Sequence, residues 1–275
     1  MSPDGVGGDA VSGDAVSPDA VGGEAMGGDA VSPDAVGGFA HLHVAGRPLI
    51  LPNVWDVAGA RALAAAGFAA VGTTSLGVAA AHGMPDGEDA SVGQTIALVA
   101  RLAGLPIHVT ADIERGSVAS AVAAAEAGAA GVNIEDGYGD PDVHAKLVRD
   151  IKRAAPGLFV NARTDTHWLR AGDISEAIRR IQMYRDAGAD GVFVPGVREP
   201  ADIAQLAAAT EAPLNVLALP DGLTVAELAA LGVARISVGS LLFRAALAAV
   251  VETALAVQRN QAVRKDLPTY RDVNP

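Results

Sequence analysis

The sequence predicts an α/β fold, a single (β/α)8 barrel of the TIM type that follows a disordered N-terminal tail. Short β-rich runs alternate with Ala-rich segments of helical spacing from Arg47 onward, and eight such pairs can be traced. A barrel of this kind typically needs about 250 residues. The alternative, an open doubly wound sheet, usually carries a Gly-rich phosphate fingerprint after its first strand. Here NVWDVAGAR follows that strand and contains no G-x-G-x-x-G pattern, so the barrel is favoured.

The elements follow one another in a regular order. The candidate strands are 47–52, 69–74, 106–112, 131–136, 158–164, 191–196, 213–219 and 234–240. The candidate helices are 56–66, 91–103, 117–127, 141–154, 173–187, 200–209, 224–231 and 241–257. Ser91, Asp140 with Pro141, and Asp173 are typical helix starts, and a Gly ends many of the helical segments.

The N-terminal tail repeats every five residues over 2–36, and each of its seven units carries one acidic residue. A period of five matches neither a helix nor a strand, and Gly, Pro, Ser and Asp recur in every unit. We therefore expect three parts: a disordered acidic tail over 1–38, a barrel domain over 39–260 and a C-terminal extension over 261–275.

Composition excludes several classes of protein. The chain of 275 residues has no cysteine, which excludes disulfides, thiolate metal sites and cysteine nucleophiles. Its formal net charge of −12, without Lys/Arg clusters, argues against binding to nucleic acid or to an anionic membrane. The longest apolar run, 241–257, is interrupted by Arg244 and Glu252, which disfavours a membrane span. No secretory signal is visible, so a cytoplasmic location is expected.

Polar residues gather where the predicted strands end. They are Asn53, Trp55 and Asp56 after the first strand, Thr73, Thr74 and Ser75 after the second, Thr110, Asp112 and Glu114 after the third, Glu135 and Asp136 after the fourth, and Asn161, Arg163 and Asp165 after the fifth. The sixth and seventh strands end in Pro195-Gly196 and Leu219-Pro220 instead. Because the carboxyl ends of barrel strands form the active-site face, the sequence predicts a polar site on one side of the mouth.

Up to four carboxylates follow the third and fourth strands: Asp112, Glu114, Glu135 and Asp136. Such close like charges repel each other and need a cation. Oxygen ligands without cysteine or paired histidines favour Mg²⁺ or Mn²⁺ over zinc. The alternative is that these acids form ordinary salt bridges, with Arg115, Arg163 or Lys146 as candidate partners.

Arg163 lies beside this acidic group and suits a carboxylate or phosphate held by two hydrogen bonds, although it could equally neutralise Glu135. TTSLG (73–77) reads as a turn that could hold an anion. Asp86, in the loop after the second strand, is a further acid near the expected metal, and His82 in the same loop could reach the mouth. The other five histidines lack metal-ligand spacing and are expected to be structural. A metal and an arginine without a nucleophile pair suggest chemistry through an enolate.

At these residues the chain resembles the isocitrate lyase/phosphoenolpyruvate mutase superfamily. The matching stretches are PNVWD, GTTSLGVAAAHGMPDGE, PIHVTADIERG, GVNIEDG, VNARTD and GADGVFVPG, and they cover nearly all of 48–245. The resemblance implies a Mg²⁺-dependent barrel that binds enolpyruvate-like intermediates. It also implies an eighth helix exchanged between subunits, here 241–257, and a homo-oligomer built as a dimer of dimers.

The resemblance also assigns roles to individual residues. Thr74, Ser75 and Leu76 match the turn that holds the carboxylate and oxo group of the substrate. Arg163 matches the substrate-binding arginine, and Asn161 beside it is expected to contact the substrate as well. Asp86 matches an acid near the reacting bond. The expected metal ligands are Asp112, Glu114 and Glu135. Asp112 matches the second acid of the family's D-A-D metal motif, and Thr110 stands in place of the first acid, so that Asp112 or Glu114 would take over its role.

Two departures limit the chemistry. The lyases of the family carry K-K-C-G-H after the fourth strand, whereas GYGD leads directly into a helix here, so cleavage of isocitrate or methylisocitrate by a cysteine acid is excluded. The longer gating loop of the mutases is missing too, since Asp136 is followed by Gly137 and not by lysine. Three hypotheses remain: a Mg²⁺-dependent C–C lyase or decarboxylase acting on a small 2-oxo or hydroxy carboxylate, a C–P bond enzyme (a phosphonomutase or phosphonopyruvate hydrolase), and a non-catalytic barrel.

Overall fold

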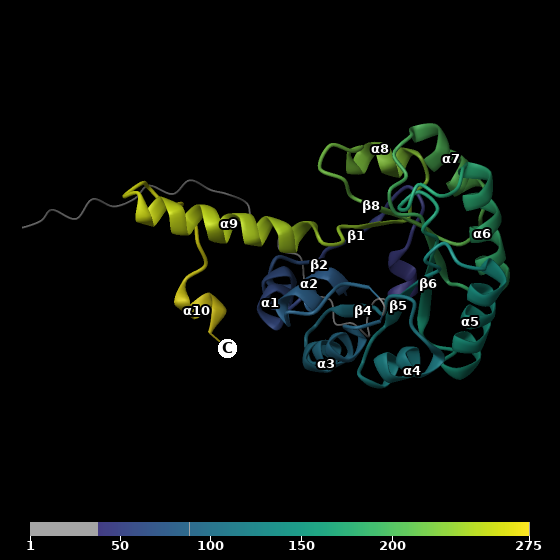
Figure 1. The fold of residues 1–275 in the computed structure, drawn as a ribbon, viewed down its shortest axis with the longest axis horizontal. Coiled ribbons are helices and arrows are strands. Elements are labelled where there is room, and N and C mark those ends of the chain that lie inside the picture. Colours follow the sequence, from purple (N-terminus) through teal and green to yellow (C-terminus); the bar gives the residue numbers. More distant parts are fainter. Residues whose placement is uncertain (1–37, 88, 275) are drawn as a thin grey trace, which may run out of the picture. The chain divides into compact units, whose positions relative to one another are not determined.

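A computed structural model describes residues 38–87 and 89–274 of the chain. The predicted tail over 1–38 lies outside this part of the chain except for Gly38, and it stays a prediction. Figure 1 shows strands that alternate with helices, and the helices α3 to α7 form an outer layer around the strands. The strands are β1 (Leu49–Leu51), β2 (Asn53–Val54), β3 (Ala70–Thr73), β4 (His108–Asp112), β5 (Gly131–Glu135), β6 (Phe159–Arg163), β7 (Gly191–Phe193), β8 (Leu214–Leu217) and β9 (Arg235–Ser237).

The helices occupy the connections between the strands. They are η1, a 3-10 helix (Phe39–Leu42), α1 (Val57–Ala65), α2 (Ser75–Ala81), α3 (Val92–Leu102), α4 (Val118–Glu126), α5 (Pro141–Ala154), α6 (Ile174–Asp186), α7 (Pro200–Ala208), α8 (Val225–Ala230), α9 (Leu241–Gln258) and α10 (Tyr270–Val273). The predicted caps are present at two helices: the Asp140 side chain accepts a hydrogen bond from the amide of Asp142, and Asp173 accepts one from Glu176.

The strands of the described residues form one parallel sheet in the order β1-β9-β8-β7-β6-β5-β4-β3-β2. β1 and β2 are two parts of one extended segment, separated only by Pro52. Since β1 pairs with β9 and β2 pairs with β3, the sheet closes on itself. The predicted (β/α)8 barrel is therefore confirmed, and its first strand is the one that divides into two.

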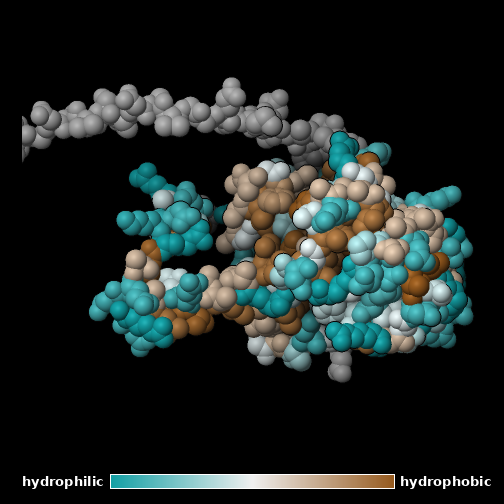
Figure 2. Space-filling view, turned by 90° about the horizontal axis from the view of Figure 1, so that it is seen from above, coloured by the Kyte–Doolittle hydropathy of each residue, from teal (hydrophilic) through white to brown (hydrophobic). Residues whose placement is uncertain are grey.

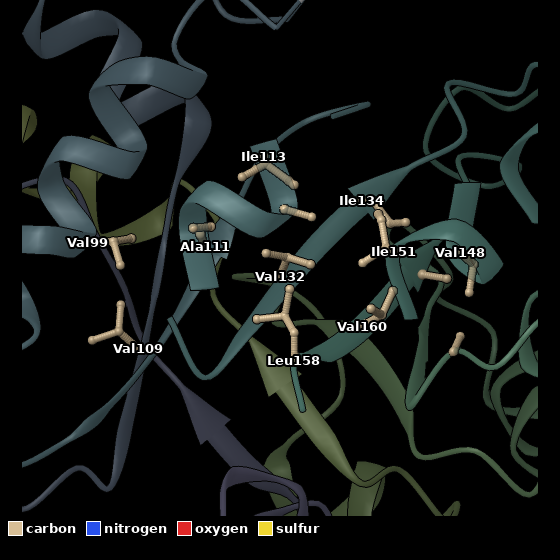
Figure 3. Close-up of a cluster of buried hydrophobic side chains, with 14 of the residues drawn as sticks. Val99, Val109, Ala111, Ile113, Val132, Ile134, Val148, Ile151, Leu158 and Val160 are labelled. Atoms are coloured by element: carbon tan, nitrogen blue, oxygen red, sulfur yellow. The ribbon is translucent and has the colours of Figure 1, made fainter. Parts of the chain in front are cut away.

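Alternation along the strands separates the core from the interior of the barrel. On β4, Val109 and Ala111 belong to the large hydrophobic core between the strands and the helices, whereas Thr110 and Asp112 alternate with them on the other side. Figure 3 shows part of this core, in which valine and isoleucine side chains of β4, β5 and β6 lie together with Val99, Val148 and Ile151 of the outer helices. The polar side chains of β4 to β6 are thus directed into the barrel.

The predicted strands and helices are all present, with boundaries shifted by a few residues. One interpretation is wrong: TTSLG was expected to be a turn, but Ser75 begins α2 and Thr74 is its N-cap residue. Gly77 lies inside this helix. The position requires glycine because a Cβ there would lie 2.7 Å from Cγ2 of Thr74 and 3.1 Å from Cβ of Trp55. A glycine that reads as a turn signal is here required for close packing.

Helix α9 exposes much of its apolar surface. Only Phe243 of α9 is buried, and its ring contacts Trp55 edge-on at 5.2 Å. Leu247, Val250 and Val251 are more than half exposed. Figure 2 shows hydrophobic side chains at the surface among the hydrophilic ones. By length and composition alone α9 could cross a membrane, which is weak evidence because other apolar helices pass the same test.

Candidate active site

A cavity of about 300 Å³ opens at the carboxyl ends of the strands. Most of the residues predicted for the site line it: Thr74, Ser75, Leu76, Asp86, Asp112, Glu114, Glu135 and Arg163. Asn161 is the exception, since it is 1% exposed and does not line this cavity. Of the described residues, no histidine lines this cavity either, and the imidazole of His82 instead bonds the carbonyl of Val78.

Asp112 and Glu135 are two of the four acidic residues that line the cavity. They end the neighbouring strands β4 and β5. Burial and, to a lesser extent, the charge of Asp112 raise the pKa of Glu135 to about 7 against the opposing effect of Arg163. Burial likewise raises the pKa of Asp112 although Arg163 opposes it. Two carboxyls whose ionised forms are this unfavourable would gain from a bound cation.

Arg163 is the cation nearest to this pair. Its Nη1 lies 2.7 Å from Oε2 of Glu135, and its Nε donates a hydrogen bond of 2.6 Å to Asp165. The salt-bridge alternative of the sequence analysis therefore holds for Glu135. Among the described residues, none accepts a hydrogen bond from Nη2 of Arg163, which leaves this nitrogen for a ligand in the cavity.

Glu114 lines the cavity, but both of its carboxylate oxygens already accept hydrogen bonds. The amide of Asp89 donates to Oε2 at 2.7 Å, and the hydroxyl of Ser91 donates to Oε1 at 2.8 Å. Its backbone has a φ of 57°, in the left-handed region that non-glycine residues seldom adopt. Glu114 thus ties the loop before α3 to the end of β4, and a metal would have to compete with these two donors.

Asp136 has a different role from its neighbour Glu135. Its Oδ2 accepts hydrogen bonds from Nη1 of Arg180 at 2.8 Å and from the hydroxyl of Tyr184 at 2.6 Å, both on α6. These partners outweigh the effect of burial and hold the pKa of Asp136 below its usual range. Asp136 does not line the cavity. It joins β5 to α6, and its charge is already compensated.

Sequence reasoning missed Asn133, which lies two residues before Glu135 on the same face of β5 and lines the cavity. Its Oδ1 accepts hydrogen bonds from Nδ2 of Asn161 at 2.7 Å and from Nη2 of Arg235 at 3.3 Å. Since its oxygen is occupied, the Asn133 amide group is left to donate into the cavity. Arg235 is fully buried, and burial lowers its pKa to about 9, so it stays cationic at neutral pH. The strand period alone could have identified Asn133.

The donor set suits a divalent ion that prefers oxygen. No three carboxylate or imidazole groups of residues 38–87 and 89–274 converge closely enough to hold a metal ion by themselves. Mg²⁺ commonly uses one or two carboxylates and keeps water or substrate oxygens in its other positions. Asp112 and Glu135, whose pKa values are raised, fit that pattern.

The protein is a (β/α)8 barrel whose cavity, with its acidic residues and Arg163, lies at the carboxyl ends of the strands. Barrel enzymes have their active sites at this end. The chain belongs to the phosphoenolpyruvate phosphomutase family, whose sequence model matches residues 39–258. The resemblance found from the sequence motifs is therefore confirmed.

Known relatives differ in their activities. An uncharacterised protein of Mycobacterium tuberculosis (strain H37Rv) is 45% identical over 241 residues, which cover 84% of this chain and 92% of the relative. The 2-methylisocitrate lyase of Bacillus subtilis is 32% identical over 64% of each chain. The crystal structure of a candidate phosphonomutase of Burkholderia cenocepacia J2315 superposes with a TM-score of 0.73 and 39% identity, and it covers 78% of this chain and 97% of the neighbour.

Proposed function

We propose that the protein is a Mg²⁺-dependent lyase or decarboxylase that breaks a C–C bond next to a 2-oxo or hydroxy carboxylate. The observation that carries the proposal is the cavity in which Asp112 and Glu135 face Arg163. Mg²⁺ would polarise the carboxylate and oxo oxygens of the substrate and so stabilise the enolate left when the bond breaks. Asp112 and Glu135 would hold the ion, with Mn²⁺ as a substitute.

The side chains of this chain would orient the substrate. Nη2 of Arg163 and the amide group of Asn133 offer hydrogen-bond donors to a carboxylate, and Thr74 and Ser75 line the same cavity. The backbone amides of these two residues already donate to the carbonyl of Val54 and to Asp112, so their hydroxyls are the groups that would contact the substrate. Asp86, which is exposed on the loop after α2 and lines the cavity, would exchange a proton with the substrate. The fixed donors would hold the substrate with the bond to be broken aligned, and such alignment supplies much of the rate.

The chain cannot use the cysteine acid of the isocitrate and methylisocitrate lyases, because it has no cysteine. A 2-oxo diacid that loses CO₂ fits the residues that are present, because CO₂ leaves without a proton. In a malate-like diacid the carbanion that leaves must take up a proton, and Asp86 would supply it.

The C–P bond reaction is a second candidate, because the family is described as phosphoenolpyruvate phosphomutase and the Burkholderia neighbour as a phosphonomutase. Against it stands the connection between β5 and α5. Only residues 136–140 separate Glu135 from Pro141, and Asp136 within it is fixed by Arg180 and Tyr184. A connection of this length leaves no segment that could close over the cavity from this side.

A substrate panel tests the proposal. The protein would be incubated with Mg²⁺ and with 2-oxo diacids, 2-hydroxy diacids and phosphonopyruvate, while pyruvate, CO₂ and inorganic phosphate are measured. We expect release of pyruvate or another 2-oxo acid, or of CO₂, that depends on Mg²⁺ and is lost in Arg163→Ala. Phosphate from phosphonopyruvate would establish the second candidate, and no turnover of any member would favour a non-catalytic barrel.

The proposal extends to assembly and location. Leu247, Val250 and Val251 expose an apolar face of α9 that is costly to leave in water, and a second copy of the chain would cover it by exchange of this helix. We expect a cytoplasmic homo-oligomer, a dimer of dimers, that binds a small carboxylate and neither nucleic acid nor membrane. Light scattering at micromolar concentration tests this, and a clean monomer would contradict it.

A further inference from the structure

Arg235 crosses the interior of the barrel below the cavity. It lies on β9, and its Nη2 is 3.3 Å from Oδ1 of Asn133 on β5. The two strands face each other across the barrel, since β8, β7 and β6 separate them on one side and β4, β3 and the divided first strand on the other. Nε of the same side chain donates a hydrogen bond of 3.1 Å to the hydroxyl of Ser237. Asn133 and Ser237 both line the cavity, whereas Arg235 does not.

Packing alone does not explain a charged side chain at this depth. Arg235 is fully buried, and both of its hydrogen-bond partners are neutral. Within the part of the chain that the structure describes, no group accepts a hydrogen bond from its Nη1. Such burial of a cation is unfavourable, and an uncharged side chain such as Met would fill the space without this cost. The charge and the donors of Arg235 therefore point to a role at the cavity above it.

Arg235 determines which way the amide group of Asn133 is turned. A guanidinium has hydrogen-bond donors and no acceptor, so the atom of Asn133 that faces it must be the oxygen. Nδ2 of Asn161 donates to the same oxygen at 2.7 Å. An amide such as that of Asn161 can donate or accept, whereas Arg235 can only donate, so Arg235 is the partner that fixes the orientation. The NH₂ group of Asn133 is thereby left for the cavity.

The place of Asn133 makes this orientation important for both the metal and the substrate. Asn133 pairs with Asp112 on the neighbouring strand and lies two residues before Glu135 on the same face of β5. An amide oxygen turned toward these carboxylates would be a further ligand for an ion that prefers oxygen. An NH₂ group at the same place is instead a donor for a negatively charged oxygen.

We propose that Arg235 is a positioning residue that turns the NH₂ group of Asn133 into the cavity, so that Asn133 binds a negatively charged oxygen of the substrate and does not bind the metal ion. This inference rests on the proposed function and deepens it, since it assigns one side chain at the metal site to the substrate. The oxygen belongs either to the enolate formed when the bond breaks or to the substrate carboxylate. Both carry the charge that strengthens a hydrogen bond from Asn133.

Oxalate and pyruvate are suitable probes, because they share a carboxylate and differ at the other end. The second carboxylate of oxalate places a charged oxygen where the enolate oxygen would form, whereas pyruvate has a neutral oxo group there. Calorimetry would give the Kd of Mg²⁺ alone and the Kd of each acid at saturating Mg²⁺. Neither measurement depends on turnover.

Arg235→Met should affect the two kinds of ligand differently. The Kd of oxalate should rise about 10- to 100-fold, because Asn133 loses the partner that holds its NH₂ group toward the ligand. The Kd of Mg²⁺ should stay the same or fall, since the Asn133 oxygen becomes free to turn toward the ion. Arg235→Lys keeps a charged donor and should retain part of the oxalate affinity. Arg101→Met, which removes an exposed arginine of α3, is the control and should change neither Kd.

A double-mutant cycle separates positioning from the bare charge of Arg235. Asn133→Ala removes the amide that Arg235 positions. In that background Arg235→Met should weaken oxalate much less than it does in the wild type, whereas a role of the charge alone would weaken oxalate by the same factor in both.

A second variant keeps the proposal testable if Arg235→Met does not fold. Asn133→Asp gives the guanidinium of Arg235 a carboxylate partner and replaces the NH₂ group with an oxygen. It should bind oxalate poorly and Mg²⁺ at least as tightly as the wild type does. Oxalate affinity equal to that of the wild type would contradict the proposal.

The outcomes are distinct. A loss for oxalate alone assigns Asn133 to the enolate oxygen, and an equal loss for pyruvate assigns it to the carboxylate. An unchanged Kd of oxalate in Arg235→Met, the same loss in both backgrounds of the cycle, or Kd values of oxalate and Mg²⁺ that rise together would each overturn the inference and leave the proposed function standing. If the wild type binds neither Mg²⁺ nor oxalate and the substrate panel is inert, the proposed function fails and this inference fails with it.

Discussion

Replacing Glu135 with Gln should stabilise the metal-free protein, which is unusual for the loss of a carboxylate that forms a salt bridge. Glu135 is paired with Arg163, yet burial and the charge of Asp112 together raise its pKa from 4.5 to about 7. The ionised side chain is therefore less favourable in the folded protein than in the unfolded chain. Gln keeps the shape and removes the charge.

The magnitude and its pH dependence follow from that pKa. One pKa unit corresponds to about 1.4 kcal/mol, so ionised Glu135 costs roughly 3 kcal/mol above pH 7. Its side chain is 21% exposed, so solvent screening reduces this figure only in part. Between pH 4.5 and 7 the folded protein holds a proton that the unfolded chain has lost, so wild-type stability falls as the pH rises. The advantage of Glu135→Gln should be nearly absent at pH 4.5 and complete at pH 8.

Thermal denaturation in EDTA at pH 5 and pH 8 measures this difference. For a chain of this size, about 3 kcal/mol corresponds to a rise in Tm of roughly 6–12 °C, expected at pH 8 and much smaller at pH 5. Glu126→Gln, an exposed position on α4, is the control and should change Tm little at either pH. A lower Tm for Glu135→Gln at pH 8, or an equal gain at both pH values, would refute the reasoning.

Three further predictions concern its neighbours and the tail. Asp136→Asn should destabilise the fold by about 1–3 kcal/mol in urea denaturation, because Arg180 keeps only the salt bridge to Glu176 and the hydroxyl of Tyr184 loses its carboxylate acceptor; a neutral result would contradict this. Arg163→Lys should retain Mg²⁺ binding in calorimetry yet weaken the substrate about 10- to 100-fold, and equal substrate affinity would count against the role of the guanidinium. Deletion of 1–38 should leave Tm and the oligomeric state unchanged, and a drop in Tm of more than a few degrees, or dissociation, would overturn that.

The fold could be predicted because β-rich runs alternate regularly with segments of helical spacing, and several of the long helices also carry start or end signals. Three short helices were missed, η1, α2 and α10, and α2 contains Gly77, whose lack of a side chain serves contact with Trp55. Such a contact joins residues from two different elements. No local pattern contains it.

The site could be predicted in part because strand ends converge in a barrel and because alternation separates Glu135 from Asp136. How far each inward-facing side chain lies below the mouth of the barrel could not be predicted, since this depends on strand tilt and stagger. Asn161 therefore lies beneath the cavity, where it supports Asn133. Trp168 lies beyond the end of β6 in an irregular segment, where neither periodicity nor spacing indicates which side chain turns toward the mouth.

Calorimetric titration of Mg²⁺ into the wild type, Glu135→Gln and Asp136→Asn at pH 8 tests the central claim most directly, because the two variants remove adjacent charges with different roles. We predict that the affinity falls steeply in Glu135→Gln and is largely kept in Asp136→Asn under conditions where that variant is folded. An unchanged Mg²⁺ affinity in Glu135→Gln would mean that both carboxylates serve the fold, and would contradict a metal site at this end of the barrel.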